Sequence, residues 1–349
     1  MPSIFNTCHE VYSRLLDLPP IIELLLTEYA LEPTTAHLIG SEHGNHLVYH
    51  ITTDSGTQYL VRLYRNTAPS PPWINLPSGA VWLQQQATVL EWCARHAYPA
   101  PRFQRTRDGS LVSYFAGWNA IVTEFIVGAT VPPTAHARGQ IAMLLGQLHQ
   151  YGTTTAPAEF QKLPWSWWAP IDHVTSRIQT LLEAVSFMPA EWPELVDTCQ
   201  AIFQESSRLR GFPETMIHGD PWTGNAIAPT PTESILIDWE YSGRGLAVLD
   251  LACLLSDCFG YPDRPAQVDE ASIASVMDGY TRYRNLPTVE LDVLPVAIRF
   301  GAAFRTAIRL HLAQDTGWED SIRRWLIHEQ ARIAISDQIA SRAQAMTTS

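Results

Sequence analysis

The residues best suited to chemistry lie in one stretch, from Thr215 to Ala252. His218 and Asp220 are separated by one residue, Asn225 follows five residues after Asp220, and an apolar run then ends at Asp238. Strand ends hold side chains rigidly, whereas loops let a substrate approach. This set suits phosphoryl transfer, which needs a carboxylate to accept a hydroxyl proton and oxygen ligands that hold Mg²⁺ against phosphates.

Each of these residues has a simpler explanation when it is taken alone. Asp220 precedes a proline, Asn225 follows a glycine, and Asp238 could cap the next segment, all of which are ordinary turn positions. Zinc binding by His218 and Asp220 is disfavoured because no cysteine or histidine lies nearby at ligand spacing. The order of the whole set, and not any one member, favours phosphoryl transfer.

The His-x-Asp-x-x-x-x-Asn pattern and the Ile-Leu-Ile-Asp run resemble the catalytic loop and metal-binding segment of one family. It is the aminoglycoside phosphotransferase and choline kinase-like family, the small-molecule relatives of the protein kinases. The resemblance implies that Asp220 is the catalytic base and that Asn225 and Asp238 are magnesium ligands. It places His218 with the catalytic residues as a structural support for the loop, and it makes Asp250 the anchor of the following helix.

Composition indicates a globular chain of one large or two ordinary domains. Its 349 residues are 46% hydrophobic and 17% charged, and the net charge is −12. This charge disfavours binding to nucleic acid or anionic membranes, and it suits a cationic partner. The five cysteines are scattered without a Cys-x-x-Cys pair, and neither a signal peptide nor a membrane-spanning stretch is apparent. We therefore expect a cytoplasmic protein.

One oddity of the composition narrows the choice of phosphate site. Lys162 is the only lysine in the chain and lies in Gln-Lys-Leu-Pro. A Walker A loop requires Gly-Lys-Ser/Thr. A P-loop is therefore excluded, and a kinase-like cradle is the phosphate site that remains.

Three short strands with a small polar loop are expected near the start of the chain, over 36–40, 46–53 and 57–64. The loop between the first two contains Ser41, Gly44 and Asn45. In kinase-like folds this loop offers backbone N–H groups to the nucleotide phosphates. Only one glycine is present, so the glycine-rich loop of the protein kinases is absent and an ordinary hairpin loop is the alternative.

The resemblance assigns further nucleotide contacts to this half of the chain. Arg62 occupies the strand position of the protein kinase lysine and can bind phosphate bidentately, although it could also be a surface arginine. The segment containing Glu124 and Ile126 corresponds to the hinge that meets adenine. Gln86 stands where the protein kinases carry a glutamate on the next helix, which is a departure from the pattern.

After Gly128 the sequence becomes helical, so we expect a boundary there. The resemblance implies an α+β, two-lobed protein-kinase-like fold, with an N-lobe of residues 1–127 around an antiparallel sheet and a mostly helical C-lobe of residues 128–349. Periodicity predicts one continuous helix over 319–341. The cluster Trp165-Ser166-Trp167-Trp168 is expected in the core, with a substrate pocket as the alternative.

The leading hypothesis is an enzyme that transfers the γ-phosphoryl group of ATP, with Mg²⁺, to a hydroxyl of a small molecule. The acceptor could be an aminoglycoside, a choline-like amine, homoserine or a sugar. A nucleotide-binding pseudokinase without catalysis is one alternative, favoured by Gln86 and the sparse glycines. A protein serine/threonine kinase is the other, disfavoured because a helix begins soon after Asp238, at Leu246, with no long activation segment.

Overall fold

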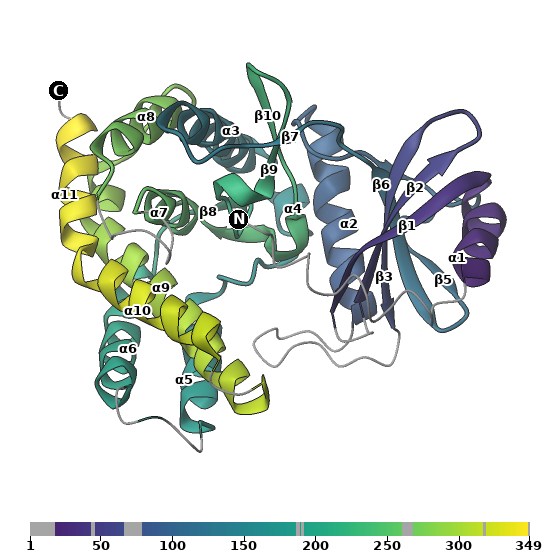
Figure 1. The fold of residues 1–349 in the computed structure, drawn as a ribbon. Helices are drawn as coiled ribbons and strands as arrows, with labels where there is room; N and C mark the ends of the chain where they lie inside the picture. Colours follow the sequence, from purple (N-terminus) through teal and green to yellow (C-terminus); the bar gives the residue numbers. More distant parts are fainter. Residues whose placement is uncertain are drawn as a thin grey trace. The chain divides into compact units, whose positions relative to one another are not determined.

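The computed structural model describes residues 18–42, 46–65, 79–185, 189, 192–259, 268–316 and 319–347. The chain divides into two compact units, Met1–Val127 and Gly128–Ser349 (Figure 1). Among the described residues, no helix combines the length and the apolar character needed to cross a bilayer.

The first unit is built on an antiparallel sheet with the order β1-β2-β3-β6-β4, in which β5 also pairs with β6. The turn Asp54-Ser55-Gly56 connects β2 to β3, and it uses a glycine at φ 78°. The strands are β1 (Pro33–Glu42), β2 (His46–Thr53), β3 (Gln58–Arg65), β4 (Phe103–Gln104), β5 (Ser113–Phe115) and β6 (Trp118–Glu124). The helices are α1 (Leu18–Leu24), continued by the π-helical turn Leu25–Tyr29, and α2 (Gly79–Arg95).

Alternation along β3 divides the first unit into two faces. Val61 and Leu63 are buried in a core cluster that includes residues of α1 and of the π-helical turn. Tyr64 lies on the other face, where its ring contacts Trp82 of α2. Arg62 therefore lies on the α2 side of the sheet, and Figure 1 shows α1 and α2 on opposite sides. The predicted three-stranded meander is confirmed.

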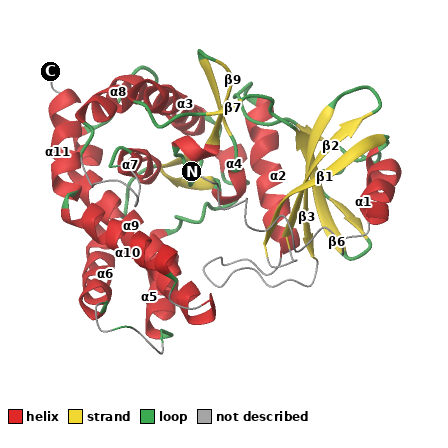
Figure 2. Cartoon of the chain, in the orientation of Figure 1, coloured by secondary structure: helices red, strands yellow, loops and turns green. Residues whose placement is uncertain are grey.

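The second unit is mostly helical (Figure 2). Its strands form one sheet with the order β10-β9-β7 and a pair β11-β8. They are β7 (Ala129–Thr130), β8 (Glu214–Ile217), β9 (Ala226–Thr230), β10 (Glu233–Leu236) and β11 (Gly243–Leu246). The helices are α3 (Ala135–Thr154), α4 (Pro157–Phe160), α5 (Ile171–Glu183), α6 (Pro193–Glu205), α7 (Ala247–Asp257), α8 (Glu270–Thr281), α9 (Thr288–Thr316), α10 (Asp320–Ala334) and α11 (Ser336–Thr347).

Two buried helices hold this unit together. In α7, Leu251, Leu254 and Leu255 are fully buried. The long helix α9 packs against α5, α6, α7, α10 and α11. Helix α3 passes close to β8, where a Cβ on Gly152 would lie 2.3 Å from the backbone nitrogen of Met216. Helices α3 and α7 both contact β8, the strand that leads into the candidate site.

The prediction of one helix over 319–341 is wrong. Helix α10 ends at Ala334, and Ile335 adopts φ −105° and ψ 7°, outside the helical region. The Ser336 hydroxyl donates to the Ile333 carbonyl at 2.9 Å, across the break. Helical periodicity continues on both sides of such a break, so the pattern of apolar residues does not reveal it.

Candidate active site

The loop after β8 carries His218, Gly219 and Asp220 in a tight turn. Gly219 has φ 90°, and a Cβ at this position would lie 2.4 Å from the carbonyl oxygen of Tyr241. Only glycine combines this backbone conformation with so close an approach. The turn therefore presents Asp220 at the end of a buried strand.

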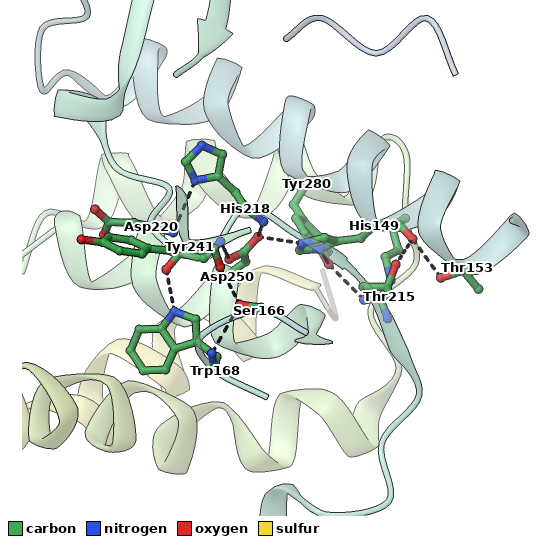
Figure 3. Close-up of polar contacts among 12 residues, drawn as sticks. His149, Thr153, Ser166, Trp168, Thr215, His218, Asp220, Tyr241, Asp250 and Tyr280 are labelled. Carbon is green, nitrogen blue, oxygen red and sulfur yellow. Dashed lines mark hydrogen bonds and ion pairs between the residues drawn. The ribbon is translucent and has the colours of Figure 1, made fainter. Parts of the chain in front are cut away.

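Asp250 on α7 anchors this turn from behind (Figure 3). Its Oδ2 accepts the His218 backbone N–H at 2.7 Å, and its Oδ1 accepts the Gly219 backbone N–H at 2.8 Å. Nε2 of His149 lies 3.1 Å from the same Oδ2, and Nδ1 of His149 lies 2.7 Å from the Tyr280 hydroxyl. The expected anchoring by Asp250 is thus present, and His149 is a structural residue of the network.

His218 connects the loop to the strand that ends before Asp238. Its Nδ1 accepts the Asp220 backbone N–H at 3.3 Å, so the proton resides on Nε2, which donates to the Ile237 carbonyl at 2.9 Å. Burial lowers the pKa of His218, against the raising effect of Asp250 and Asp238. The fully buried ring is therefore neutral and positions the backbone rather than touching a substrate.

The tryptophan cluster contributes to the same support. Trp168 is buried, and its indole N–H donates to the Gly219 carbonyl. Its ring packs on Phe304 of α9 with 4.4 Å between centroids, while Trp167 packs on Tyr241. The expectation of core packing is confirmed for Trp168, which fixes the turn before Asp220.

Asn225 lies against Asp220 in the structure. Its amide Nδ2 donates to Oδ2 of Asp220 at 2.8 Å and to the Asp220 carbonyl at 3.0 Å. Its backbone carbonyl accepts the Ile237 N–H at 2.9 Å, which brings the segment before Asp238 alongside. Asp220, Asn225 and the segment that ends at Asp238 therefore lie next to one another.

Asp238 follows β10 in the left-handed conformation, with φ 64° and ψ 57°. Such a conformation is uncommon for a residue other than glycine, and it is found at sites that the surrounding structure holds in place. The charge of Asp238 acts on Asp220, His218 and Tyr241. Asp238 is thus close enough to Asp220 to share a cluster with it.

The residues present fit a magnesium ion. Both hydrogen bonds of the Asn225 side chain use its NH₂ group, so among the described residues its carbonyl oxygen is left for a ligand. Mg²⁺ prefers hard oxygen donors and is commonly bound by one or two protein oxygens together with phosphates. The amide oxygen of Asn225 and the carboxylate of Asp238 supply this donor set.

Asp220 is electrostatically unusual. Burial, reinforced by the nearby negative charge of Asp238, raises its pKa to about 6. Arg305 and the hydrogen bonds from Asn225 and Trp222 oppose this rise. A carboxylate with a pKa close to neutrality is well matched to accepting a proton from a hydroxyl group.

The residues predicted to contact the nucleotide belong to the first unit, and the structure describes some of them and not others. Arg62 is half-buried on the central strand β3. Ser41 lies in β1, opposite Leu47, rather than in a loop, so its predicted placement is wrong because the strand pairing continues to Glu42. Gly44 and Asn45 fall outside the described residues.

The hinge residues follow the central sheet. Glu124 ends β6, and its Oε1 accepts the Arg102 backbone N–H at 2.8 Å. Ile126 lies two residues beyond the end of that strand and is half-buried. Gln86 is buried on α2, whereas the neighbouring Glu91 forms an ion pair with Arg105.

Two side chains beside Asp220 are not indicated by any pattern in the sequence. The Sγ atom of Cys253 on α7 lies 3.9 Å from Oδ1 of Asp220. Arg305 on α9 influences the pKa of Asp220. Each lies far from the catalytic loop in sequence and belongs to a regular helical pattern, so only the packing of α7 and α9 reveals them.

Comparison with known proteins identifies related chains. Residues 35–286 match the model of the phosphotransferase enzyme family. A homoserine kinase of Acidiphilium cryptum (strain JF-5) is 26% identical over 282 residues, which are 76% of each chain. A homoserine kinase of Xanthobacter autotrophicus (strain ATCC BAA-1158 / Py2) is 27% identical over 304 residues, 82% of this chain and 83% of the relative. For the homoserine kinase of Beijerinckia indica (strain ATCC 9039 / DSM 1715 / NCIMB 8712), at 28% identity, the match spans 61% of this chain and 64% of the relative.

Solved structures with the same arrangement of elements include two small-molecule kinases. An amicoumacin kinase in complex with AMP-PNP, Ca²⁺ and Ami superposes with a TM-score of 0.69 at 15% identity, covering 93% of this chain and 94% of that one. A choline kinase of Streptococcus pneumoniae superposes with a TM-score of 0.59 at 16% identity, covering 92% and 98%. These likenesses confirm the predicted α+β, two-lobed kinase-like fold.

Proposed function

The chain belongs to the phosphotransferase enzyme family, and on that premise we propose that Asp220 is the catalytic base for transfer of the ATP γ-phosphoryl group to a small-molecule hydroxyl. The contact of Asn225 with Asp220, at 2.8 Å, is the observation that carries this proposal, because it joins the base to a metal ligand. Asp238 completes the set as the second metal ligand.

The step that we assign to Asp220 is a proton transfer. As the acceptor oxygen forms its bond to the γ-phosphorus and the bond from that phosphorus to the leaving ADP oxygen breaks, the hydroxyl proton passes to an Asp220 carboxylate oxygen. Asn225 orients this carboxylate through the hydrogen bond to Oδ2. His218, Asp250 and Trp168 act as positioning residues that fix the turn beneath it.

Metal and nucleotide binding follow from the same assignment. Asn225 and Asp238 would hold Mg²⁺ through oxygen atoms, and the bound ion would neutralise charge on the phosphates. In the first unit, Arg62 is proposed to bind phosphate. The segment from Ser41 to Asn45 is proposed to offer N–H groups, and Glu124 and Ile126 to meet adenine.

The acceptor is proposed to be a small hydroxyl compound of the size of homoserine. This suggestion comes from the homoserine kinases that align with most of the chain. A cationic group on the acceptor would be favoured by the acidic residues Asp220, Asp238 and Glu240. Desolvation raises the pKa of the half-buried Tyr241, and Glu240 raises it further, which places a negative charge beside the site.

The decisive experiment measures ADP release with Mg²⁺ and ATP against a panel of amino alcohols, hydroxy amino acids, aminoglycosides and sugars. The variant Asp220→Asn should lower kcat by roughly 10²- to 10⁴-fold, the usual contribution of a general base. Its Kd for a fluorescent ATP analogue should stay within about twofold of the parent value, since Asp220 holds neither the metal nor the nucleotide here.

Two outcomes would contradict this assignment. Full activity of Asp220→Asn would exclude the residue as the base. A parent protein that binds ATP but phosphorylates no member of the panel, and hydrolyses ATP no faster than Asp238→Ala, would favour the alternative of a nucleotide-binding regulator without catalysis.

A further inference from the structure

A buried cluster of charges lies beside Asp220, where α9 packs against α10. Its centre is Glu329, whose side chain is fully buried. Oε1 accepts from Nε of Arg305 at 3.0 Å and from Nη1 of Arg309 at 3.1 Å, and Oε2 accepts from Nη2 of Arg305 at 3.2 Å and from Nη1 of Arg332 at 2.8 Å. Three guanidinium groups thus share one carboxylate.

The four side chains of this cluster carry more positive than negative charge. Burial works to raise the pKa of Glu329, but the three arginines hold it well below its usual range, so the carboxylate is ionised. Burial together with the neighbouring arginines lowers the pKa of Arg309 to about 10 despite Glu329, so this group also stays charged at neutral pH. One negative and three positive charges leave an excess of two among these four side chains, and the charge of Asp220 offsets part of it at Arg305.

An excess of buried charge is costly unless something compensates for it. Arg332 has a second contact, because its Nη2 lies 3.1 Å from Nε2 of His328, while its buried Nε has no hydrogen-bond partner among the described residues. Arg309 stacks on Trp325 with its guanidinium carbon 4.6 Å from the ring centroid. Arg305 donates to Glu329 from both Nε and Nη2, and no acceptor for its Nη1 group is found among the side chains that the structure describes.

Arg305 also lies close to the catalytic loop, since its charge and that of Asp220 each affect the pKa of the other. Arg305, Cys253, Gly301 and Trp168 line one small recess of the second unit. Cys253 is the residue whose Sγ lies 3.9 Å from Oδ1 of Asp220, and Trp168 bonds the turn before Asp220. A small molecule whose hydroxyl reaches Asp220 would therefore have its other end within reach of Arg305.

From this arrangement we infer that Arg305 binds a carboxylate of the acceptor, and that the substrate class is the hydroxy acids, including hydroxy amino acids. The planar guanidinium suits a carboxylate, and the anion would offset the excess positive charge of the cluster. Arg309 and Arg332 share Glu329 with Arg305 and so maintain that excess. The inference rests on the proposed function, because it needs Asp220 to receive the hydroxyl.

The test compares two acceptors that differ only in the carboxylate, L-homoserine and 3-aminopropan-1-ol. The readout is the ratio of their kcat/KM values, measured by ADP release with Mg²⁺ and ATP. A change that acts through Asp220 alters both acceptors equally and cancels in this ratio. We expect the parent enzyme to prefer L-homoserine by roughly 10- to 150-fold, the range expected for hydrogen bonds to charged groups.

Substitutions of Arg305 then assign the preference to one residue. Arg305→Gln should abolish most of the preference, and Arg305→Lys should retain part of it through charge alone. Both variants leave each oxygen of Glu329 with one arginine partner, so the fold has a means of surviving the change. Arg299→Gln is the matched control on α9, since Arg299 pairs with Glu205 and Asp337 instead, and it should keep the parent ratio.

A dead-end analogue provides a reading that does not depend on turnover by the variants. L-2-aminobutyrate has the carboxylate of homoserine but no hydroxyl, and it should inhibit the parent enzyme competitively against 3-aminopropan-1-ol. Should Arg305→Gln fail to fold, Arg305→Lys and this inhibition decide the matter.

The possible failures are distinguishable. Equal use of the two acceptors by the parent enzyme, or an unchanged ratio in Arg305→Gln, would overturn the carboxylate assignment while leaving the phosphotransferase proposal in place. If the parent enzyme phosphorylated no hydroxyl compound at all, the proposed function would fail, and the assignment of Arg305 would fail with it.

Discussion

At the residue scale, the chemistry depends on how the surroundings tune one carboxylate. Asp220 is held by an amide on one side and lies near a second carboxylate and a guanidinium on the others. Its neighbour His218 is neutral and buried, so it contributes geometry rather than charge. The spacing of these residues was readable in the sequence, but the raised pKa of Asp220 was not, because it arises from burial and from Asp238.

The pKa of Asp220 predicts a pH profile. A base must be deprotonated to accept a proton, and burial together with Asp238 raises this pKa from 3.8 to about 6. The value of kcat/KM for the acceptor should therefore be low at pH 5 and rise with pH through about 6, reporting on the free enzyme.

Initial rates between pH 5 and 8, in buffers of constant ionic strength, would check this expectation. The control is the fluorescence of the folded protein across the same range, which separates titration from unfolding. A profile that stayed flat down to pH 5 would show that Asp220 ionises at its ordinary pKa.

At the scale of the elements, the loop is fixed by contacts from helices that are distant in sequence. The Asp250 carboxylate of α7 accepts hydrogen bonds from the backbone N–H groups of His218 and Gly219. His149 of α3 in turn contacts the Asp250 carboxylate. The sequence predicted α3 and α7 from their apolar periodicity. It missed the break at Ile335 and the placement of Ser41 in a strand, since backbone pairing and local capping decide such details rather than apolar periodicity.

The anchor predicts a measurable loss of stability. Asp250→Ala would leave the buried N–H groups of His218 and Gly219 without acceptors, at about 1–3 kcal/mol for each unsatisfied group. Urea unfolding should therefore show a loss of roughly 2–6 kcal/mol.

The matched control for this variant is Asp278→Ala. Asp278 also lies on a helix of the second unit and pairs with Arg282, but that pair is exposed. Removing it should change the free energy of unfolding by at most about 1 kcal/mol. Equal losses in the two variants would mean that Asp250 does not anchor the loop.

At the scale of the whole molecule, both the composition and the position of Lys162 indicate that arginine rather than lysine binds phosphate. The chain has 23 basic residues, and a single one of them is lysine. Lys162 is exposed beyond the end of α4 and takes no part in the site described above. Phosphate recognition by side-chain cations must therefore use arginine, with Arg62 as the proposed residue.

Group-specific reagents can check this division between lysine and arginine. Acylation of Lys162 should leave the rate of ADP formation unchanged within about twofold, because an exposed side chain outside the site contributes little. Phenylglyoxal, which modifies arginine, should inactivate the enzyme, and Mg²⁺ with ATP should slow that loss. Peptide mapping would identify the modified residues. Inactivation that followed acylation of Lys162 would contradict the role of arginine.

The sequence predicted the fold correctly, but it did not identify the chemical class of the acceptor. The strands around Arg62 and the loop around Asp220 follow from local patterns, and the solved structures confirm the fold to which they belong. The charge of the acceptor subsite could not be read, since it depends on Arg305 and Glu329 meeting across two helices. Acidic residues near Asp238 suggested only a cationic acceptor.

The sharing of one carboxylate by three guanidinium groups has an evolutionary consequence. Loss of Glu329 alone would leave three mutually repelling cations, whereas loss of a single arginine is buffered by the other two. A lineage that changes its acceptor would therefore be expected to replace an arginine first and the glutamate last. An alignment of related sequences should contain chains that keep the glutamate but lack one of the arginines. Chains that keep all three arginines without the glutamate should be rare.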